Sequence, residues 1–153
     1  MSEHDFLRRA VALASDAVRG GSEPFGSLIV RAGTIIAEGT NATTHDPTAH
    51  AEIVAIRRAC ASLGTNDLSD CEMFTSCEPC PMCLGAIYWA RLSRLTFACD
   101  RHDAARAGLT EDVALYDEVA RPPEARRIPT VRHSLPEAAA ALAAWMARSP
   151  PQG

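Results

Sequence analysis

The sequence predicts an α/β fold, a three-layer α/β/α sandwich around a mixed five-stranded sheet. Three observations support this prediction: helix-like and strand-like segments alternate, no segment repeats, and no long linker divides the chain. A length of 153 residues with 47% apolar residues suits one hydrophobic core. We therefore expect residues 1–153 to form a single domain.

The predicted elements alternate from the first residues onward. In chain order they are helix 6–18, strands 25–30 and 34–37, helix 51–63, strand 72–76, helix 79–91, strand 95–99, helix 112–119, strand 128–131 and helix 135–146. Apolar residues recur at helical spacing in the first two helices, which end at Gly20 and Gly64. The first two strands flank Ala32-Gly33, a pattern typical of a β-hairpin.

The second half of the chain follows the same alternation. Pro79 suits the first turn of a helix, because the missing N–H has no partner there in any case. Pro122-Pro123 ends the short helix over 112–119, and the last helix has a clear amphipathic pattern. Pro129 stands inside the predicted fifth strand, which makes it the weakest of the five.

The composition and the net charge indicate what kind of ligand the protein binds and where in the cell we expect it. The net charge is −4 and all 15 basic residues are Arg, so the balance argues against a nucleic-acid partner and favours a small substrate. No apolar run approaches the length of a membrane span. The acidic start, residues 1–5, lacks the basic and apolar regions of a signal peptide, so we expect a cytoplasmic protein.

The cysteines indicate metal chemistry. Of six cysteines, three fall within residues 77–83, and a cytoplasmic chain seldom forms disulfides. Cys80 and Cys83 are three apart in the first turn of a predicted helix, where free N–H groups and the helix dipole favour thiolates. His50 begins another predicted helix. If the two helix starts meet, one imidazole and two thiolates converge on one ion.

Three protein ligands leave one position of a tetrahedral zinc ion open for water. Zinc lowers the pKa of such a water to about 7. Glu52, two residues after His50, is expected beside that water, where it can act as the proton shuttle. A closed structural site with Cys77 as fourth ligand is the alternative, but Cys77 is expected at the strand end, pointing away.

The two metal motifs together resemble a known family. His50-Ala51-Glu52 followed by Pro79-Cys80-Pro81-Met82-Cys83 is the signature of the cytidine deaminase-like zinc deaminases. The resemblance covers roughly residues 5–133 and includes Pro24-Phe25-Gly26 and Asn41. It implies the cytidine deaminase-like fold and one zinc ion per subunit, held by His50, Cys80 and Cys83, with Glu52 as proton shuttle.

Further runs point to the bacterial guanine deaminase branch of the family, namely residues 46–52, 75–89 and 103–108. The transfer-RNA adenosine deaminases are less similar after the second cysteine, and free cytidine deaminases usually present Cys in place of the histidine. The resemblance implies a set of substrate contacts, which are Asn41, Phe25, Ala51, Trp89, and either Asp112 or Glu111, of which Asp112 is favoured.

The resemblance also implies the reaction and the assembly. The expected reaction is hydrolysis of guanine, a small purine, to xanthine and ammonia. The expected assembly is a homodimer in which C-terminal helices, about 135–148 here, can be exchanged between subunits. The family's terminal aromatic residue is missing from this chain, which ends in residues 148–153. Three alternatives stay open: a deaminase of guanosine or another nucleoside or base, a transfer-RNA adenosine deaminase, and a zinc-stabilised module without catalysis.

Overall fold

A mixed β-sheet forms the centre of the first of two compact units of the chain, residues Met1–Ala120. The computed structural model describes residues 1–148. The elements of the first unit are α1 Glu3–Arg19, β1 Gly26–Arg31, β2 Thr34–Thr40, α2 Ala51–Leu63, β3 Cys71–Cys77, α3 Pro81–Trp89, β4 Arg94–Cys99, α4 Arg101–Arg106 and α5 Glu111–Val119. Every element predicted before residue 120 is present, and α4 is an addition.

The sheet has four strands in the order β2-β1-β3-β4. Strand β1 runs antiparallel to β2 and β3, while β3 and β4 are parallel, so the predicted mixed sheet is confirmed. The predicted fifth strand is wrong within the described chain: residues 128–131 form no ladder, and Ile128 and Val131 are exposed. Pro129 has no N–H to give to a ladder, so this segment cannot pair along its whole length.

The hairpin between β1 and β2 has the expected two-residue turn. Arg31 pairs with Thr34, and the two residues between them, Ala32 and Gly33, have φ angles of 48° and 75°. Positive φ at both central positions matches the right-handed twist of the strands. Gly33 adopts this conformation without strain, whereas Ala32 does so at a small cost.

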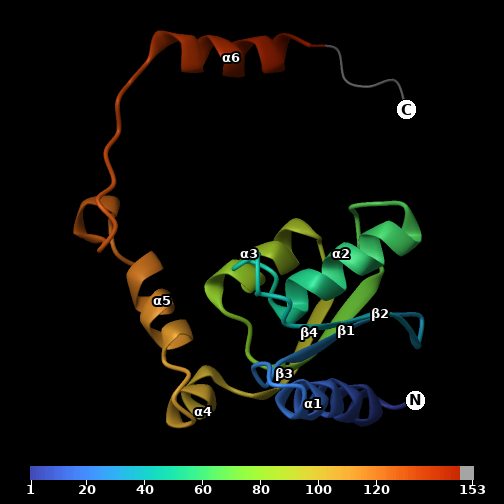
Figure 1. The fold of residues 1–153 in the computed structure, drawn as a ribbon. Helices are drawn as coiled ribbons and strands as arrows, with labels where there is room; N and C mark the ends of the chain where they lie inside the picture. The colour runs from blue at the N-terminus through green and yellow to red at the C-terminus, as the bar shows by residue number, and fades with distance from the viewer. Residues whose placement is uncertain (149–153) are drawn as a thin grey trace. The chain divides into compact units, whose positions relative to one another are not determined.

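Helices cover both faces of the sheet, as the predicted sandwich requires (Figure 1). Because side chains alternate along a strand, Leu28 and Val30 of β1 pack toward α1 and Ile29 between them packs toward α2. The α1 face is completed by Phe6, Ala10 and Phe74, and the other face by a group from α2, α3 and β3, mainly Ala55, Ala59, Met73 and Ile87. One core therefore holds α1 on one face of the sheet, and the other core holds both α2 and α3 on the opposite face.

The second unit begins at Arg121 and is described as far as Arg148. It contains a 3-10 turn, Pro123–Ala125, and α6, Pro136–Ala147, which matches the predicted last helix. Helix α6 has no buried residue, and Leu142, Trp145 and Met146 are exposed. Among the described residues, no helix has both the length and the apolar composition needed to cross a membrane.

Candidate metal and active site

The site lies where the first turns of α2 and α3 meet. His50 is the N-cap residue of α2, and Cys80 is the N-cap residue of α3. Neither side chain caps its own helix, so both are free to turn toward a common point. Cys83 follows in the first turn of α3, with Pro81 at a position that needs no N–H donor.

The three side chains fit a single metal ion. One ligand atom from each of His50, Cys80 and Cys83 can be chosen so that all lie within 4.8 Å of one another. Cys80 Sγ is 3.7 Å from His50 Nδ1. A tetrahedral zinc ion with bonds of about 2.0–2.3 Å holds its ligand atoms roughly 3.3–3.8 Å apart. One nitrogen and two sulfur donors at this spacing suit zinc.

Cys77 is not part of this group. Its thiol donates to the carbonyl oxygen of Asp100 over 3.7 Å. Burial raises the pKa of the Cys77 thiol to about 12. Among the described residues, the ligand atoms that lie within 4.8 Å of one another belong to His50, Cys80 and Cys83 and not to Cys77, so the metal group has three protein ligands.

The two cysteines of the group share one negative charge when no metal is present. The hydrogen bond with Cys83 lowers the pKa of Cys80 to about 4, and His50 adds to this effect. The same hydrogen bond, together with burial, raises the pKa of Cys83. Cys80 is therefore the thiolate of the pair. A bound zinc ion would take both as thiolates and release the proton of Cys83.

Glu52 is a buried carboxyl group beside the metal ligands. Its residue is only 6% exposed, and its Oε2 accepts from the thiol of Cys83 over 3.5 Å. Burial is the main cause that raises the pKa of Glu52 to about 7. A carboxyl group with this pKa can both accept and donate a proton near neutrality.

Two neighbouring cavities open from the metal group. The inner cavity is small, about 20 Å³, and is lined by Phe25, His50, Glu52, Glu78, Cys80 and Asp112. The outer cavity, about 230 Å³, is lined by Glu23, Phe25, His50, Gly108, Leu109, Thr110, Glu111 and Asp112. Three residues line both cavities, so the two form one path from the surface to the ligand atoms. Five carboxyl groups line this path beside the aromatic ring of Phe25, a lining that favours ligands rich in N–H donors.

Three of the six predicted substrate residues line this path. Phe25 and Asp112 line both cavities, and Glu111 lines the outer one. Burial raises the pKa of Asp112, with the charge of Cys80 as a second cause. Ala51 is fully buried at the start of α2, where its backbone N–H is taken by the side chain of Asn41.

Asn41 and Trp89 lie elsewhere. Asn41 lines neither cavity: its Oδ1 accepts from the N–H of Ala51 at 2.9 Å, and its Nδ2 donates to Glu23 at 2.6 Å. Trp89 ends α3 with 88% of its surface exposed and also lines neither cavity. Within the described chain, Trp89 therefore presents its ring to the surface.

A network of residues that the sequence did not single out supports the segment between β3 and α3, which leads to the metal ligand Cys80. Glu78 Oε2 accepts from the backbone N–H of Arg101, and Glu78 Oε1 accepts from its guanidinium, at 2.9 and 2.8 Å. Arg101 in turn lies 4.3 Å from the ring centre of Tyr116, whose hydroxyl donates to the Pro79 carbonyl at 2.6 Å. This network ties α4 and α5 to the start of α3. Only the position of Glu78 between Cys77 and Cys80 could have drawn attention to it.

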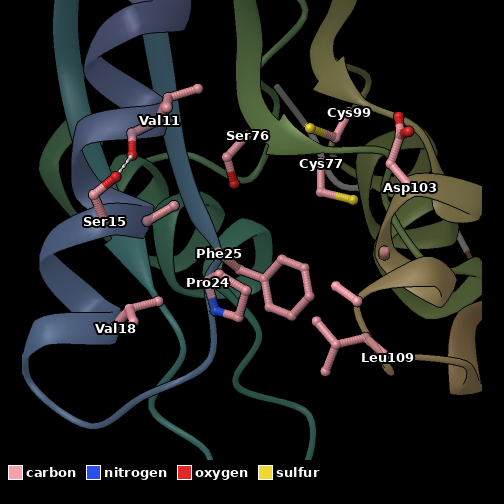
Figure 2. A pocket seen from close by; sticks show the side chains of 13 residues that line it. Val11, Ser15, Val18, Pro24, Phe25, Ser76, Cys77, Cys99, Asp103 and Leu109 are labelled. Atoms are coloured by element: carbon pink, nitrogen blue, oxygen red, sulfur yellow. Dashed lines mark hydrogen bonds between the residues drawn. The ribbon is translucent and has the colours of Figure 1, made fainter.

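An apolar cavity of about 300 Å³ lies on the other side of Phe25. Its walls come from α1, the ends of β3 and β4, and α4, and include Val11, Cys77 and Cys99 (Figure 2). The ring of Phe25 and the side chain of Leu109 face each other at its edge, and both also line the outer cavity. These two side chains separate an apolar space from a polar one.

Comparison with known proteins agrees with this geometry. The family model of the cytidine and deoxycytidylate deaminase zinc-binding region matches residues 1–99, which include all three candidate ligands and Glu52. The fold and the site thus define the class, and the chain belongs to this zinc-binding deaminase family. Zinc is the cofactor of the family, and the group of one histidine and two cysteines fits one ion.

Comparison with individual proteins shows which members of the family this chain resembles. The chain is 51% identical to guanine deaminase of Bacillus subtilis over 95% of its own length and 94% of that protein. The crystal structure of the Bacillus subtilis enzyme superposes with a TM-score of 0.93 at 48% identity, covering 100% of this chain and 99% of the other. A tRNA-specific adenosine deaminase of Aquifex aeolicus is 36% identical over 77% of this chain and 78% of the other.

Proposed function

We propose that this protein is a guanine deaminase, which hydrolyses guanine to xanthine and ammonia. The observation that carries the proposal is the open three-ligand group, with Glu52 buried beside it, in a chain that resembles guanine deaminase over nearly its full length. The acid-lined path agrees with this, because guanine offers N–H donors on several edges. Anionic substrates would be repelled by the same carboxylates.

The residues of the chain divide the chemistry between them. His50, Cys80 and Cys83 would hold the zinc ion, which supplies a Lewis acid that activates water. Glu52 would take one proton from the attacking water and pass it to N3 of guanine, and would then take the second proton from the oxygen added at C2 and pass it to the amino group that leaves. Asp112 would accept from N–H groups of the pyrimidine ring, and Phe25 would pack against the ring. Water enters and ammonia leaves, so the reaction balances.

Ammonia release from a panel of bases and nucleosides tests the proposal. We expect release from guanine at a higher kcat/KM than from guanosine, adenine, cytosine or their nucleosides. A preference for guanosine would favour the nucleoside deaminase alternative. Deamination of adenosine in transfer RNA, the activity for which the Aquifex aeolicus relative is named, would contradict the proposal if guanine were inert.

Replacement of Glu52 by Gln tests the assignment of the proton shuttle. Since Gln cannot carry a proton, kcat should fall at least about 1000-fold, near the range that general acid–base groups contribute. The zinc content, measured by atomic absorption, should stay at one ion per chain, whereas Cys83→Ser should lose zinc. Loss of zinc from Glu52→Gln would contradict the role proposed for Glu52, because it would show that this residue is a ligand.

We further propose that the active form is a cytoplasmic homodimer. The support is the row of exposed apolar residues on α6, which includes Leu142, Trp145 and Met146, because such a face is seldom left in water. The exchange of this helix between subunits would cover these residues. The expectation about the family's terminal aromatic residue falls on residues 149–153, which lie outside the described part of the chain.

A further inference from the structure

We propose that Glu23 selects free guanine over N9-substituted purines, such as nucleosides, by accepting a hydrogen bond from the imidazole N–H of the base. This inference rests on the proposed function, since it assigns an orientation to guanine in the site. It concerns a residue outside the metal group, in the segment between α1 and β1.

Glu23 stands between Asn41 and the outer cavity. Its Oε2 accepts from Asn41 Nδ2 at 2.6 Å, and the other side of the Asn41 amide is fixed because Oδ1 accepts from the N–H of Ala51. Glu23 lines the outer cavity, whereas Asn41 does not. Asn41 therefore holds the carboxylate in place, and the carboxylate is the group that a ligand meets.

One oxygen of this carboxylate is left for a ligand. Glu23 Oε1 makes no hydrogen bond with any of residues 1–148, whereas Glu23 Oε2 accepts from Asn41. An anchored acceptor with a free lone pair is suited to a ligand N–H.

The position of Glu23 along the path decides which edge of guanine it meets. The carbon that loses its amine must approach the metal ligands, which lie at the inner cavity with Glu52 and Cys80. That carbon belongs to the pyrimidine ring, so the imidazole ring must extend toward the outer cavity. Glu23 lines the outer cavity only, whereas Asp112 lines both. Asp112 thus suits the pyrimidine edge, and Glu23 suits the imidazole edge.

A purine substituted at N9 cannot satisfy this acceptor. Its neutral imidazole ring has no N–H and presents only the lone pair of N7 as a polar group. A carboxylate facing that lone pair is repelled and remains without its hydrogen bond, which is how a site built for a donor rejects an analogue that lacks it. The same reasoning applies to 9-methylguanine, which carries no ribose and so isolates the effect of the missing N–H.

The test compares Glu23→Gln with the wild-type enzyme, using guanine and 9-methylguanine. In the variant the amide oxygen still accepts from Asn41, so an NH2 donor replaces the free acceptor. We expect the KM for guanine to rise about tenfold or more, the worth of one charge-assisted hydrogen bond. The Ki of 9-methylguanine as a competitor should stay the same or fall, because N7 can now accept from the NH2 group.

The controls separate this role from others. Asp117→Asn, on the exposed side of α5, removes the same charge without touching either cavity and should change neither constant. Zinc content and Tm of Glu23→Gln should match the wild type. Equal weakening of guanine and 9-methylguanine would overturn the proposal, since Glu23 would then act only by holding Asn41. An unchanged KM for guanine in Glu23→Gln would overturn the proposal as well. Absence of ammonia release from guanine in the wild type would instead refute the proposed function.

Discussion

At the scale of single residues, the site depends on side chains whose own hydrogen bonds are already satisfied. Asn41 is held at both ends of its amide, and Glu78 accepts two bonds from Arg101. Such groups lose little freedom when a ligand binds, because their positions are set by the fold. The residues around the metal group therefore act as a preformed frame.

A substitution of Tyr116 measures how much one hydrogen bond of this frame contributes to the free energy of unfolding. Its hydroxyl donates to the Pro79 carbonyl at the start of α3, next to the metal ligand Cys80. We expect Tyr116→Phe to lower the free energy of unfolding by about 1 kcal/mol, the net worth of one such bond. Urea denaturation measures the change. Tyr88→Phe is the matched control, because Tyr88 is 77% exposed, and it should shift stability by less than about 0.5 kcal/mol. Equal effects of the two changes would show that the bond does not stabilise the loop.

At the scale of elements, the close approach of α2 to β2 positions two of the site residues. A Cβ at Gly39 would lie 2.2 Å from the Ala51 carbonyl oxygen and 2.7 Å from the Ala55 nitrogen. Both atoms are helix backbone, so neither can move alone. Gly39 thus lets the first turn of α2 reach the sheet, and His50 and Glu52 are placed by that contact.

Gly39→Ala should therefore displace the start of α2. We expect it to lower the free energy of unfolding by about 2 kcal/mol or more, as overpacking does, and to reduce zinc content. Thermal unfolding and metal analysis check this result. Gly85→Ala serves as control, because a Cβ at Gly85 meets nothing within 4 Å, and Ala in a helix should raise stability by about 0.5–1 kcal/mol. A Gly39→Ala protein with full zinc and normal stability would contradict the close packing.

A second contact between elements gives a pH-dependent contribution to stability. Arg9 of α1 donates two hydrogen bonds of 2.7 Å to Glu38 of β2, and this pairing lowers the pKa of the Glu38 carboxyl from its usual value of 4.5. Because the folded state binds the proton less tightly than the unfolded state, the contribution is complete above about pH 4.5 and is lost as the pH falls through the lowered pKa.

Glu38→Gln should accordingly be less stable than the wild type at pH 7 by up to about 1 kcal/mol, since the pair is partly exposed. The difference should shrink toward zero as the pH falls well below 4.5, the usual value for the free carboxyl. Urea denaturation at pH 7 and at lower pH measures it, and zinc release at low pH affects both proteins alike. Glu72→Gln, at a carboxylate with no ion pair in the described chain, should cost less than about 0.5 kcal/mol. A constant difference at every pH would exclude the ion pair as its source.

At the scale of the whole molecule, apolar surface points to assembly. Strand β4 is an edge strand with Phe97 40% exposed, and α3 ends in the exposed Tyr88 and Trp89. Helix α6 of the second unit is exposed throughout. Exposed apolar residues on several elements are typical of surfaces that a partner covers.

Sedimentation equilibrium tests the proposed dimer. We expect a mass of twice the chain mass of 16.4 kDa. Leu142→Glu, in the apolar stripe of α6, should shift the equilibrium toward the monomer, because it would bury a charge in the interface. Ala140→Glu, on the opposite side of the same helix, introduces the same side chain and should leave the dimer intact. A wild-type protein that sediments as a monomer would contradict the proposal.

The sequence alone determined the elements up to residue 120 except α4, the alternation of helices and strands, and the metal group. Such features follow from local spacing: Cys80 and Cys83 share one helix turn, and Gly64, with a φ of 65°, ends α2. Periodicity and capping are properties of a few consecutive residues, so they can be seen without the fold.

The tertiary structure alone decided which distant side chains meet. The network of Glu78, Arg101 and Tyr116 joins three elements, and the contact of Glu23 with Asn41 spans a hairpin. It also decided that residues 128–131 form no strand, because a strand exists only where a neighbour supplies its hydrogen bonds. Trp89 has a large apolar side chain of the kind usually found in a core, yet its place on an uncovered face of α3 leaves it exposed. Burial and pairing depend on what packs opposite, which local sequence does not specify.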